Sequence, residues 1–345
     1  MTEPHKHDSR IRAYLQFIAA LFYFIGARAL ARHAAQGLAG APWQPLVEQA
    51  SLVFLLLVGY AGMGFALTRQ QQPVSAQGLP LRTGAVGEAG LGIAAGWGAA
   101  AACVAAMAIF GGIVVRFQGS PTAFGWLVAD LAYFLLLTLA EEIAFRGYGF
   151  QRLSRALGSS VAVIAYVLLY ALFARLQPGA NTASVFVAIA LGLLLSTAYL
   201  RTRALWVGWG LNFGWKASRA LIFGLVVSGN STHSSIVEGD PMGSFWLTGG
   251  GFGLDGSWFA FLILLIAIPF VYRATRELDF RYNAPEIIPG GIPVDLDAAA
   301  RRQHEAAMGQ AVPAAPALVQ ITPLAAPSEP AAMSAPDHNA ANDSL

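Results

Sequence analysis

Long runs of apolar residues alternate with short polar or glycine-rich connections along most of the chain. A helix that crosses the hydrocarbon core of a bilayer needs about 20 predominantly apolar residues. On that criterion, helices are predicted at residues 13–30, 47–67, 87–115, 122–145, 159–176, 182–200, 204–227 and 258–272. The third is long enough to tilt or to break at its glycines, and the last is short and contains Pro269. The pattern predicts an all-α fold, a polytopic membrane bundle of about eight transmembrane helices.

The composition fits a membrane protein and excludes several other classes. Hydrophobic residues make up 56% of the 345 residues and charged residues only 12%, against about 25% charged residues in soluble domains. The net charge is +2 and the basic residues are scattered singly, so no nucleic-acid partner is expected. Cys103 is the only cysteine, which excludes an intramolecular disulfide or a thiolate metal cluster.

The placement of basic residues predicts an orientation, because short cytoplasmic loops carry an excess of Lys and Arg. If the chain crosses the membrane eight times, most of its basic residues fall on one side of the membrane. These are the residues of the amino terminus, the connections near 69–82, 152–155 and 201–203, and the chain after 272. The connection 228–257 has no Lys or Arg and is expected outside as a turn-rich loop, whereas Arg28, Arg32 and Arg116 are exceptions. We therefore expect a multi-pass protein of the cell inner (plasma) membrane with both termini in the cytoplasm.

Three regions follow from the same pattern. Residues 1–86 form an amino-terminal segment with two transmembrane helices, and the first is interpreted as an anchor rather than a cleaved signal peptide. Residues 87–280 form a membrane core. Residues 281–345 form a cytoplasmic tail rich in Ala and Pro, which is expected to be largely disordered.

Charged residues at the end of the fourth apolar run are the main candidates for chemistry. Charge at a membrane boundary is expensive and usually marks function. On a helix, Glu142 and Arg146 are four residues apart and can pair, which leaves Glu141 free to act as a general base that activates water. The alternative is an interfacial ion pair that only fixes the helix. Asp130 lies nearly on the same face, and could pair with Lys216 or Arg219 or continue a polar path.

The segment EEIAFRGYGFQRL at 141–153 resembles the first motif of the CPBP family, the CAAX-processing and bacteriocin-processing (Abi) intramembrane proteases. Residues 190–218 and 247–257 also resemble parts of this family, and roughly 88–272 is covered. The resemblance implies a helical membrane fold with a polar chamber open to the cytoplasmic side, where peptide bonds are cut. It implies membrane lipid as surroundings, and a membrane protein or a lipid-modified peptide as substrate. Glu141 would activate water with a histidine and, in one mechanism, with zinc.

This chain departs from the family at both histidine positions. Aligned on the motifs, Tyr170 takes the Phe position and Ala174 the His position of the second motif, while Asn212 and Lys216 take the His and Asn positions of the third. The six histidines all fall in termini or loops, so they are not expected to replace the missing pair. A zinc site typically needs three protein ligands, and the carboxylates alone would favour a hard cation. No cofactor or metal is therefore expected.

Two interpretations of the candidate catalytic residues Glu141, Glu142, Arg146, Asn212 and Lys216 remain. In one, Lys216 pairs with Glu141, the fold is kept and the chemistry is lost, since a carboxylate bonded to an ammonium is a poorer base. The protein would then be a pseudoenzyme that serves as a membrane scaffold, a peptide-binding protein or a self-immunity factor. In the other, Glu141 remains the base of a weakened, metal-free endopeptidase and Asn212 and Lys216 are oxyanion donors. A small-solute transporter would predict repeated halves, and no clear repeat is present.

Overall fold

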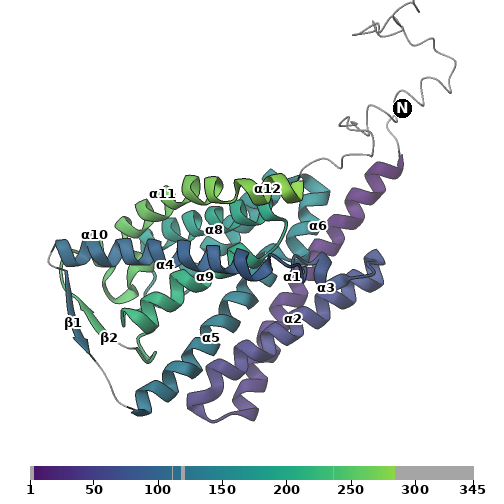
Figure 1. The fold of residues 1–345 in the computed structure, drawn as a ribbon. Coiled ribbons are helices and arrows are strands. Elements are labelled where there is room, and N and C mark those ends of the chain that lie inside the picture. Colours follow the sequence, from purple (N-terminus) through teal and green to yellow (C-terminus); the bar gives the residue numbers. More distant parts are fainter. Residues whose placement is uncertain (1–3, 111, 118–120, 236, 284–345) are drawn as a thin grey trace, which may run out of the picture. The chain divides into compact units, whose positions relative to one another are not determined.

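The structure, a computed structural model, describes residues 4–110, 112–117, 121–235 and 237–283 and is almost entirely helical in these ranges (Figure 1). The longer helices are α1 (Pro4–Leu38), α2 (Gln44–Thr68), α4 (Ala85–Ile109), α5 (Pro121–Arg146), α6 (Tyr148–Leu157), α7 (Ser159–Arg175), α8 (Thr182–Thr202), α9 (Trp206–Ala217), α11 (Trp258–Ala274) and α12 (Arg276–Asn283). Short helices are α3 (Pro73–Ala76) and α10 (Phe245–Thr248), and the strands are β1 (Ile113–Phe117) and β2 (Val237–Pro241). The all-α class is confirmed.

Helices form at all eight segments that the apolar runs predict. By length and composition, four helical stretches of the described chain could cross a membrane, namely Ser9–Leu38, Ala41–Thr68, Ala85–Ile109 and Thr182–Thr202. A fifth is reached if α11 and α12, which are bent by 52°, count as one span. The helix α7 is apolar but short. The chain is thus a multi-pass membrane protein, while the number of about eight spans and their orientation stay predictions.

Two of the predicted helices end early. The third predicted helix, 87–115, stops at Ile109, and the next residues form β1, whose Phe117 lies opposite Val237 of β2 in an antiparallel pair. Its β-branched sequence favours a strand. The seventh, 204–227, ends as α9 at Ala217 and continues only as one π-helical turn, Ser218–Ile222.

The connection 228–257, which was predicted as a turn-rich external loop, contains more regular structure than the sequence indicated. It contains β2, α10 and two 3-10 turns, and the residues from Leu254 to Ser257 are buried. These turns close against the end of α9 through Asp255, as described below. The predicted tail lies outside the described residues from position 284 onward, and the predicted region boundaries stay predictions.

Glycines bring α4 and α9 into direct backbone contact. A Cβ built on Gly96 would lie 2.2 Å from the Leu211 carbonyl oxygen, and one built on Gly210 would lie 2.1 Å from the Ala89 oxygen. Gly92 and Gly214 make equally close approaches. We call these four residues the glycine seam. Such close contact needs residues without a side chain, and it fixes the position of α9, the helix that carries Asn212 and Lys216.

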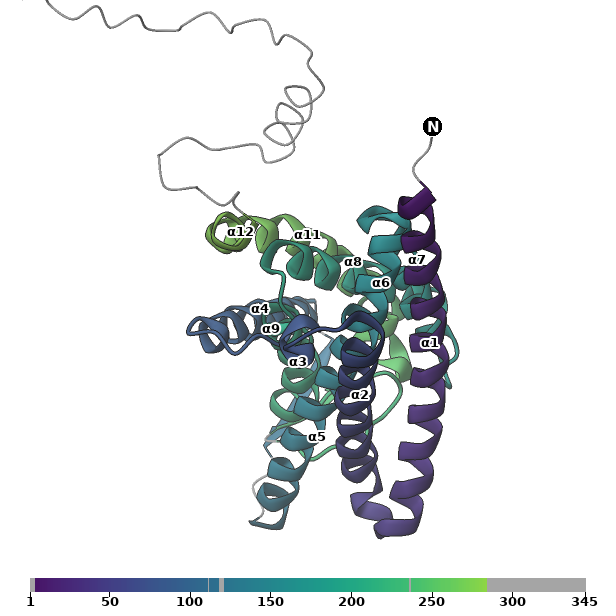
Figure 2. The same cartoon turned by 90° about the vertical axis from the view of Figure 1, so that its right-hand side faces the viewer.

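The remaining helices surround α5, α8 and α9. The helix α8 is the most deeply buried of the apolar helices and packs against α7 on one side and α11 on the other. The helices α1 and α2 run side by side as a hairpin, which packs on α6 through α1 and on α5 through α2 (Figure 2). This hairpin faces the carboxyl-terminal half of α5, where Glu141 and Glu142 lie.

Candidate functional site

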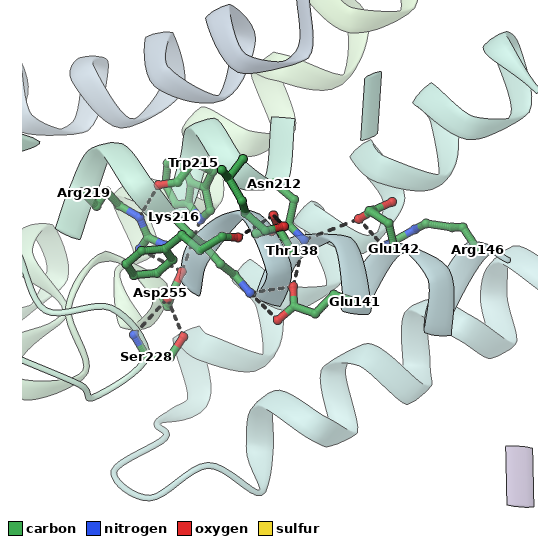
Figure 3. A network of polar contacts seen from close by, with 12 residues as sticks. Thr138, Glu141, Glu142, Arg146, Asn212, Trp215, Lys216, Arg219, Ser228 and Asp255 are labelled. Carbon is green, nitrogen blue, oxygen red and sulfur yellow. Dashed lines mark hydrogen bonds and ion pairs between the residues drawn. The ribbon is translucent and has the colours of Figure 1, made fainter. Parts of the chain in front are cut away.

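The helices α5 and α9 bring all five predicted site residues into one network (Figure 3). The Lys216 Nζ donates to both carboxylate oxygens of Glu141, at 2.5 and 2.6 Å. The Asn212 Nδ2 donates to Glu141 Oε2 at 2.8 Å and to Glu142 Oε1 at 3.4 Å. Asn212 and Lys216 are one helical turn apart, so a single face of α9 supplies both donors. The predicted pairing of Lys216 with Glu141 is present, and Glu141 is not free.

The fifth residue, Arg146, binds Glu142 inside the protein. The Arg146 Nη1 donates to Glu142 Oε1 at 2.9 Å, and the two side chains are 2% and 0% exposed. The helical spacing predicted this pair. Gly208 of α9 makes room for it, because a Cβ there would lie 2.9 Å from Glu142 Oε2. The Arg146 guanidinium also lies 5.7 Å from the centre of the Tyr170 ring, the residue at the Phe position of the second motif.

Another buried ion pair, which the sequence did not reveal, involves the π-helical turn that follows α9. Arg219 Nη1 lies 2.9 Å from Asp255 Oδ1, and the backbone N–H and hydroxyl of Ser228 donate to Asp255 Oδ2 at 3.1 and 2.7 Å. The Trp215 indole donates to the same carboxylate at 3.3 Å. Burial raises the pKa of Asp255, but Arg219 and Ser228 outweigh it and hold this pKa below its usual range.

Asp130 pairs with a histidine. Of the two roles left open for Asp130, pairing with Lys216 or Arg219 is not observed, because both are bonded elsewhere, to Glu141 and Asp255, whereas a place on a polar path stays a prediction. The Asp130 carboxylate instead lies 3.3 Å from His233 Nδ1 and accepts a hydrogen bond of 2.7 Å from the Ser234 backbone N–H. The sequence did not identify the pair with His233, because the connection that carries His233 folds back over α5, which apolar periodicity does not reveal.

One cavity of about 580 Å³ connects these groups. Its lining includes Glu141, Lys216, Asp255 and His233, and Ala174 at the vacant histidine position. The α1–α2 hairpin forms the facing wall with further polar residues: Arg28, Arg32, Gln36, Gln44, Glu48 and Gln49. Apolar side chains of α2, α5 and α8 complete the lining. The site is therefore a mixed polar and apolar chamber built from more of the chain than the family motifs.

The donor set in this chamber does not suit zinc. In the described ranges, no group of three or more His, Cys, Asp and Glu side chains could hold a metal ion, and zinc sites typically use three such ligands. Both oxygens of Glu141 are bonded to Lys216, an ammonium that repels a cation. That the site holds no cofactor stays a prediction.

Each acid of the network has a basic partner. Glu141 is paired with Lys216, Glu142 with Arg146 and Asp255 with Arg219. Pairing of this kind offsets the large penalty of burying isolated charges. What differs is access: the Glu141 side chain is 21% exposed and lines the cavity, whereas Glu142 is fully buried. A ligand in the cavity can thus reach Glu141 but not Glu142, and it meets Glu141 as a carboxylate that already accepts three hydrogen bonds.

Comparison with known proteins matches the segment that carries the motifs. Residues 122–218 match the family model of type II CAAX prenyl endopeptidase Rce1-like proteins. No curated protein and no solved structure matches the chain. The matched segment contains α5 to α9 and thereby Glu141, Glu142, Arg146, Asn212 and Lys216. His233, Asp255 and the α1–α2 hairpin fall outside it. The resemblance stated from the sequence is confirmed.

Proposed function

We propose that this chain, whose residues 122–218 match the family model of type II CAAX prenyl endopeptidase Rce1-like proteins, is a membrane protein that binds a lipid-modified peptide without cleaving it. The family glutamate is kept, but as part of an ion pair. The cavity that would hold the substrate is also kept. Binding of the family type of ligand therefore remains possible while hydrolysis is suppressed.

The observation that carries this proposal is the two-fold contact between Lys216 and Glu141. A general base needs a lone pair that is free to take a proton from water. Here Lys216 Nζ lies within 2.6 Å of both oxygens, and Asn212 occupies Oε2 as well. Lys216 is itself only 7% exposed, so releasing Glu141 would leave an ammonium buried without its partner. That cost holds the carboxylate in the pair.

A weakened, metal-free endopeptidase is the second candidate, and one observation favours it. Glu141 faces the cavity with 21% of its side chain exposed, next to the amide of Asn212 and the ammonium of Lys216. Donors that are already positioned beside a carboxylate could also stabilise an oxyanion. In this mechanism a bound peptide would have to draw Lys216 away from Glu141 before water is activated.

The test separates binding from cleavage on the full-length protein in lipid nanodiscs. The probe is a fluorescent farnesylated peptide with a C-a-a-X ending, and binding is followed by anisotropy while mass spectrometry follows cleavage. We expect saturable binding and no cleavage above that of empty nanodiscs. The variant Glu141→Gln should bind within a few-fold of the unaltered protein. Glu277→Gln serves as the matched control, since Glu277 is exposed on α12.

Two outcomes would contradict the proposal in different ways. Cleavage that is lost in Glu141→Gln but kept in Glu277→Gln would establish the endopeptidase instead. Failure of the farnesylated peptide to bind at all would refute a peptide-binding function. An unfarnesylated peptide that binds equally well would refute the requirement for lipid modification.

A further inference from the structure

Two arginines of the apolar helix α1 line the cavity. Arg28 and Arg32 are four residues apart, so they lie on one face of α1, and both line the 580 Å³ cavity. They also line a second pocket of about 430 Å³, whose lining residues all belong to α1. Both fall in the stretch Ser9–Leu38, which is apolar enough to cross a membrane. Charge in such a stretch is a functional-site hypothesis by default.

These two guanidinium groups have no acidic partner in the part of the chain that the structure describes. Arg28 and Arg32 are exposed. Of the basic side chains buried in the described ranges, Arg146, Lys216, Arg201 and Arg219 each pair with a carboxylate and Arg152 does not. Neither Arg28 nor Arg32 has a carboxylate oxygen within 4 Å, although Glu48 lines the same cavity. The α1 wall thus presents two positive charges that nothing in the described protein neutralises.

Arg28 stands close to the position that the family histidine would occupy. Its guanidinium carbon lies 5.6 Å from the centre of the Phe173 ring, and Phe173 directly precedes Ala174, the residue at the histidine position. The contact is a cation–π interaction, which favours the charge beside that ring. The helix α1, which lies outside the matched segment, therefore brings a permanent positive charge to the wall where the family side chain is missing.

Three glutamines in the same cavity indicate what kind of molecule it suits. Gln36, Gln49 and Gln177 come from α1, α2 and the residues after α7, and all line the cavity. Their side chains make no hydrogen bond within the described ranges, and Gln49 is only 9% exposed. A carboxamide both donates and accepts hydrogen bonds. Unused carboxamides match the alternating donors and acceptors of a peptide backbone better than the phosphate and acyl chains of a lipid.

We infer that Arg28 and Arg32 bind the free C-terminal carboxylate of a peptide whose last residues lie along these glutamines. The cavity volume falls within the range of small-molecule sites, about 300–1,000 Å³, so a short chain end fits and a long segment does not. Guanidinium groups bind carboxylates with paired, charge-assisted hydrogen bonds. The inference rests on the proposed function, because it specifies how the same cavity holds its peptide.

The experiment compares two otherwise identical farnesylated C-a-a-X peptides, one with a free carboxylate and one with a C-terminal amide. Binding to the protein in nanodiscs of neutral lipid is measured by anisotropy. Because hydrogen bonds to a charged group are lost, the amide should bind about tenfold or more weakly. In Arg28→Gln/Arg32→Gln the two peptides should bind equally. The control, Arg10→Gln/Arg12→Gln, removes two exposed arginines of the same helix and should keep the preference.

The outcomes distinguish this inference from the function on which it rests. Equal binding of acid and amide by the unaltered protein refutes the carboxylate site but leaves peptide binding in place, and this comparison needs no variant to fold. No binding of either peptide refutes both. If Arg28→Gln/Arg32→Gln keeps the acid preference but retains less anionic phospholipid on purification than the control does, the pair is a lipid phosphate site and the inference is wrong.

Discussion

Replacing Arg146 by methionine should destabilise the protein strongly, because it leaves Glu142 buried without a counter-charge. Glu142 is 0% exposed. Its remaining contact would be the 3.4 Å hydrogen bond from Asn212, and its Oε2 atom has no partner among the described residues. Removing one partner of a buried ion pair costs about 3–5 kcal/mol. Methionine keeps most of the aliphatic stem of arginine, so little of this cost comes from lost packing.

Cys103 offers a direct assay of this effect. It is the only cysteine and is 0% exposed, packed in the core beside α9. Its reaction with a thiol reagent therefore reports opening of the structure. At about 1.4 kcal/mol per tenfold, a loss of 3–5 kcal/mol raises the labelling rate by about two to three and a half orders of magnitude, as long as opening stays rapid and reversible.

The double variant Arg146→Met/Glu142→Gln tests the reasoning. Once both charges are gone, most of the stability should return, and the double-mutant cycle should show a coupling energy of about 2–3 kcal/mol. Asp279→Asn is the control for a more exposed pair, because the Asp279 side chain is 36% exposed; it should cost less than about 1 kcal/mol. A single Arg146→Met variant that labels no faster than Asp279→Asn would refute the account of a buried, charge-dependent pair.

Two further predictions concern the packing of α4 and the acid-dependence of stability. Gly96→Ala should destabilise the folded protein by about 1–3 kcal/mol, because its Cβ would meet the Leu211 oxygen. The control Gly98→Ala, on the same helix, meets nothing within 4 Å and should be neutral or stabilising. The rate of Cys103 labelling measures the stability of both variants. The pKa of Asp255 is held below its usual range, so its stabilising contribution is present above the unfolded pKa of about 3.9 and is lost as the pH falls through the folded value. The difference in melting temperature between the unaltered protein and Asp255→Asn, followed by circular dichroism, should therefore shrink from pH 6 to pH 3, and a constant difference would contradict it.

Features that depend on neighbours in the sequence could be predicted, and the site shows this clearly. The spacing of Glu142 and Arg146 predicted their ion pair, because residues four apart meet on a helix. The apolar runs predicted the positions of the helices, because hydrophobic patterning is also a local property of the sequence. The pairing of Glu141 with Lys216 came from the family resemblance instead, since nothing in the spacing of residues 75 positions apart brings them together.

Features made by distant segments could not be predicted. Asp255 and His233 looked like residues of an external loop, yet that connection folds onto α5 and α9 and places both in the cavity lining. Residues 113–115 continued an apolar run and were predicted as helix, because a short apolar run has the same appearance in a buried helix and a strand. These residues form a strand because they pair with β2, which lies more than a hundred positions later in the sequence.

The strand pair indicates which segment of this protein could be exchanged as a unit. Phe117 pairs with Val237, so the chain leaves β1 and returns at β2 only one strand spacing away, about 4.8 Å. The segment between the two strands, which includes the whole matched segment 122–218, therefore has adjacent ends. Segments with adjacent ends are the ones that tolerate insertion and circular permutation. The helices from α5 to α9 could therefore be exchanged between related chains as one segment joined at this strand pair, provided that the surfaces that pack on α1, α2 and α4 are retained.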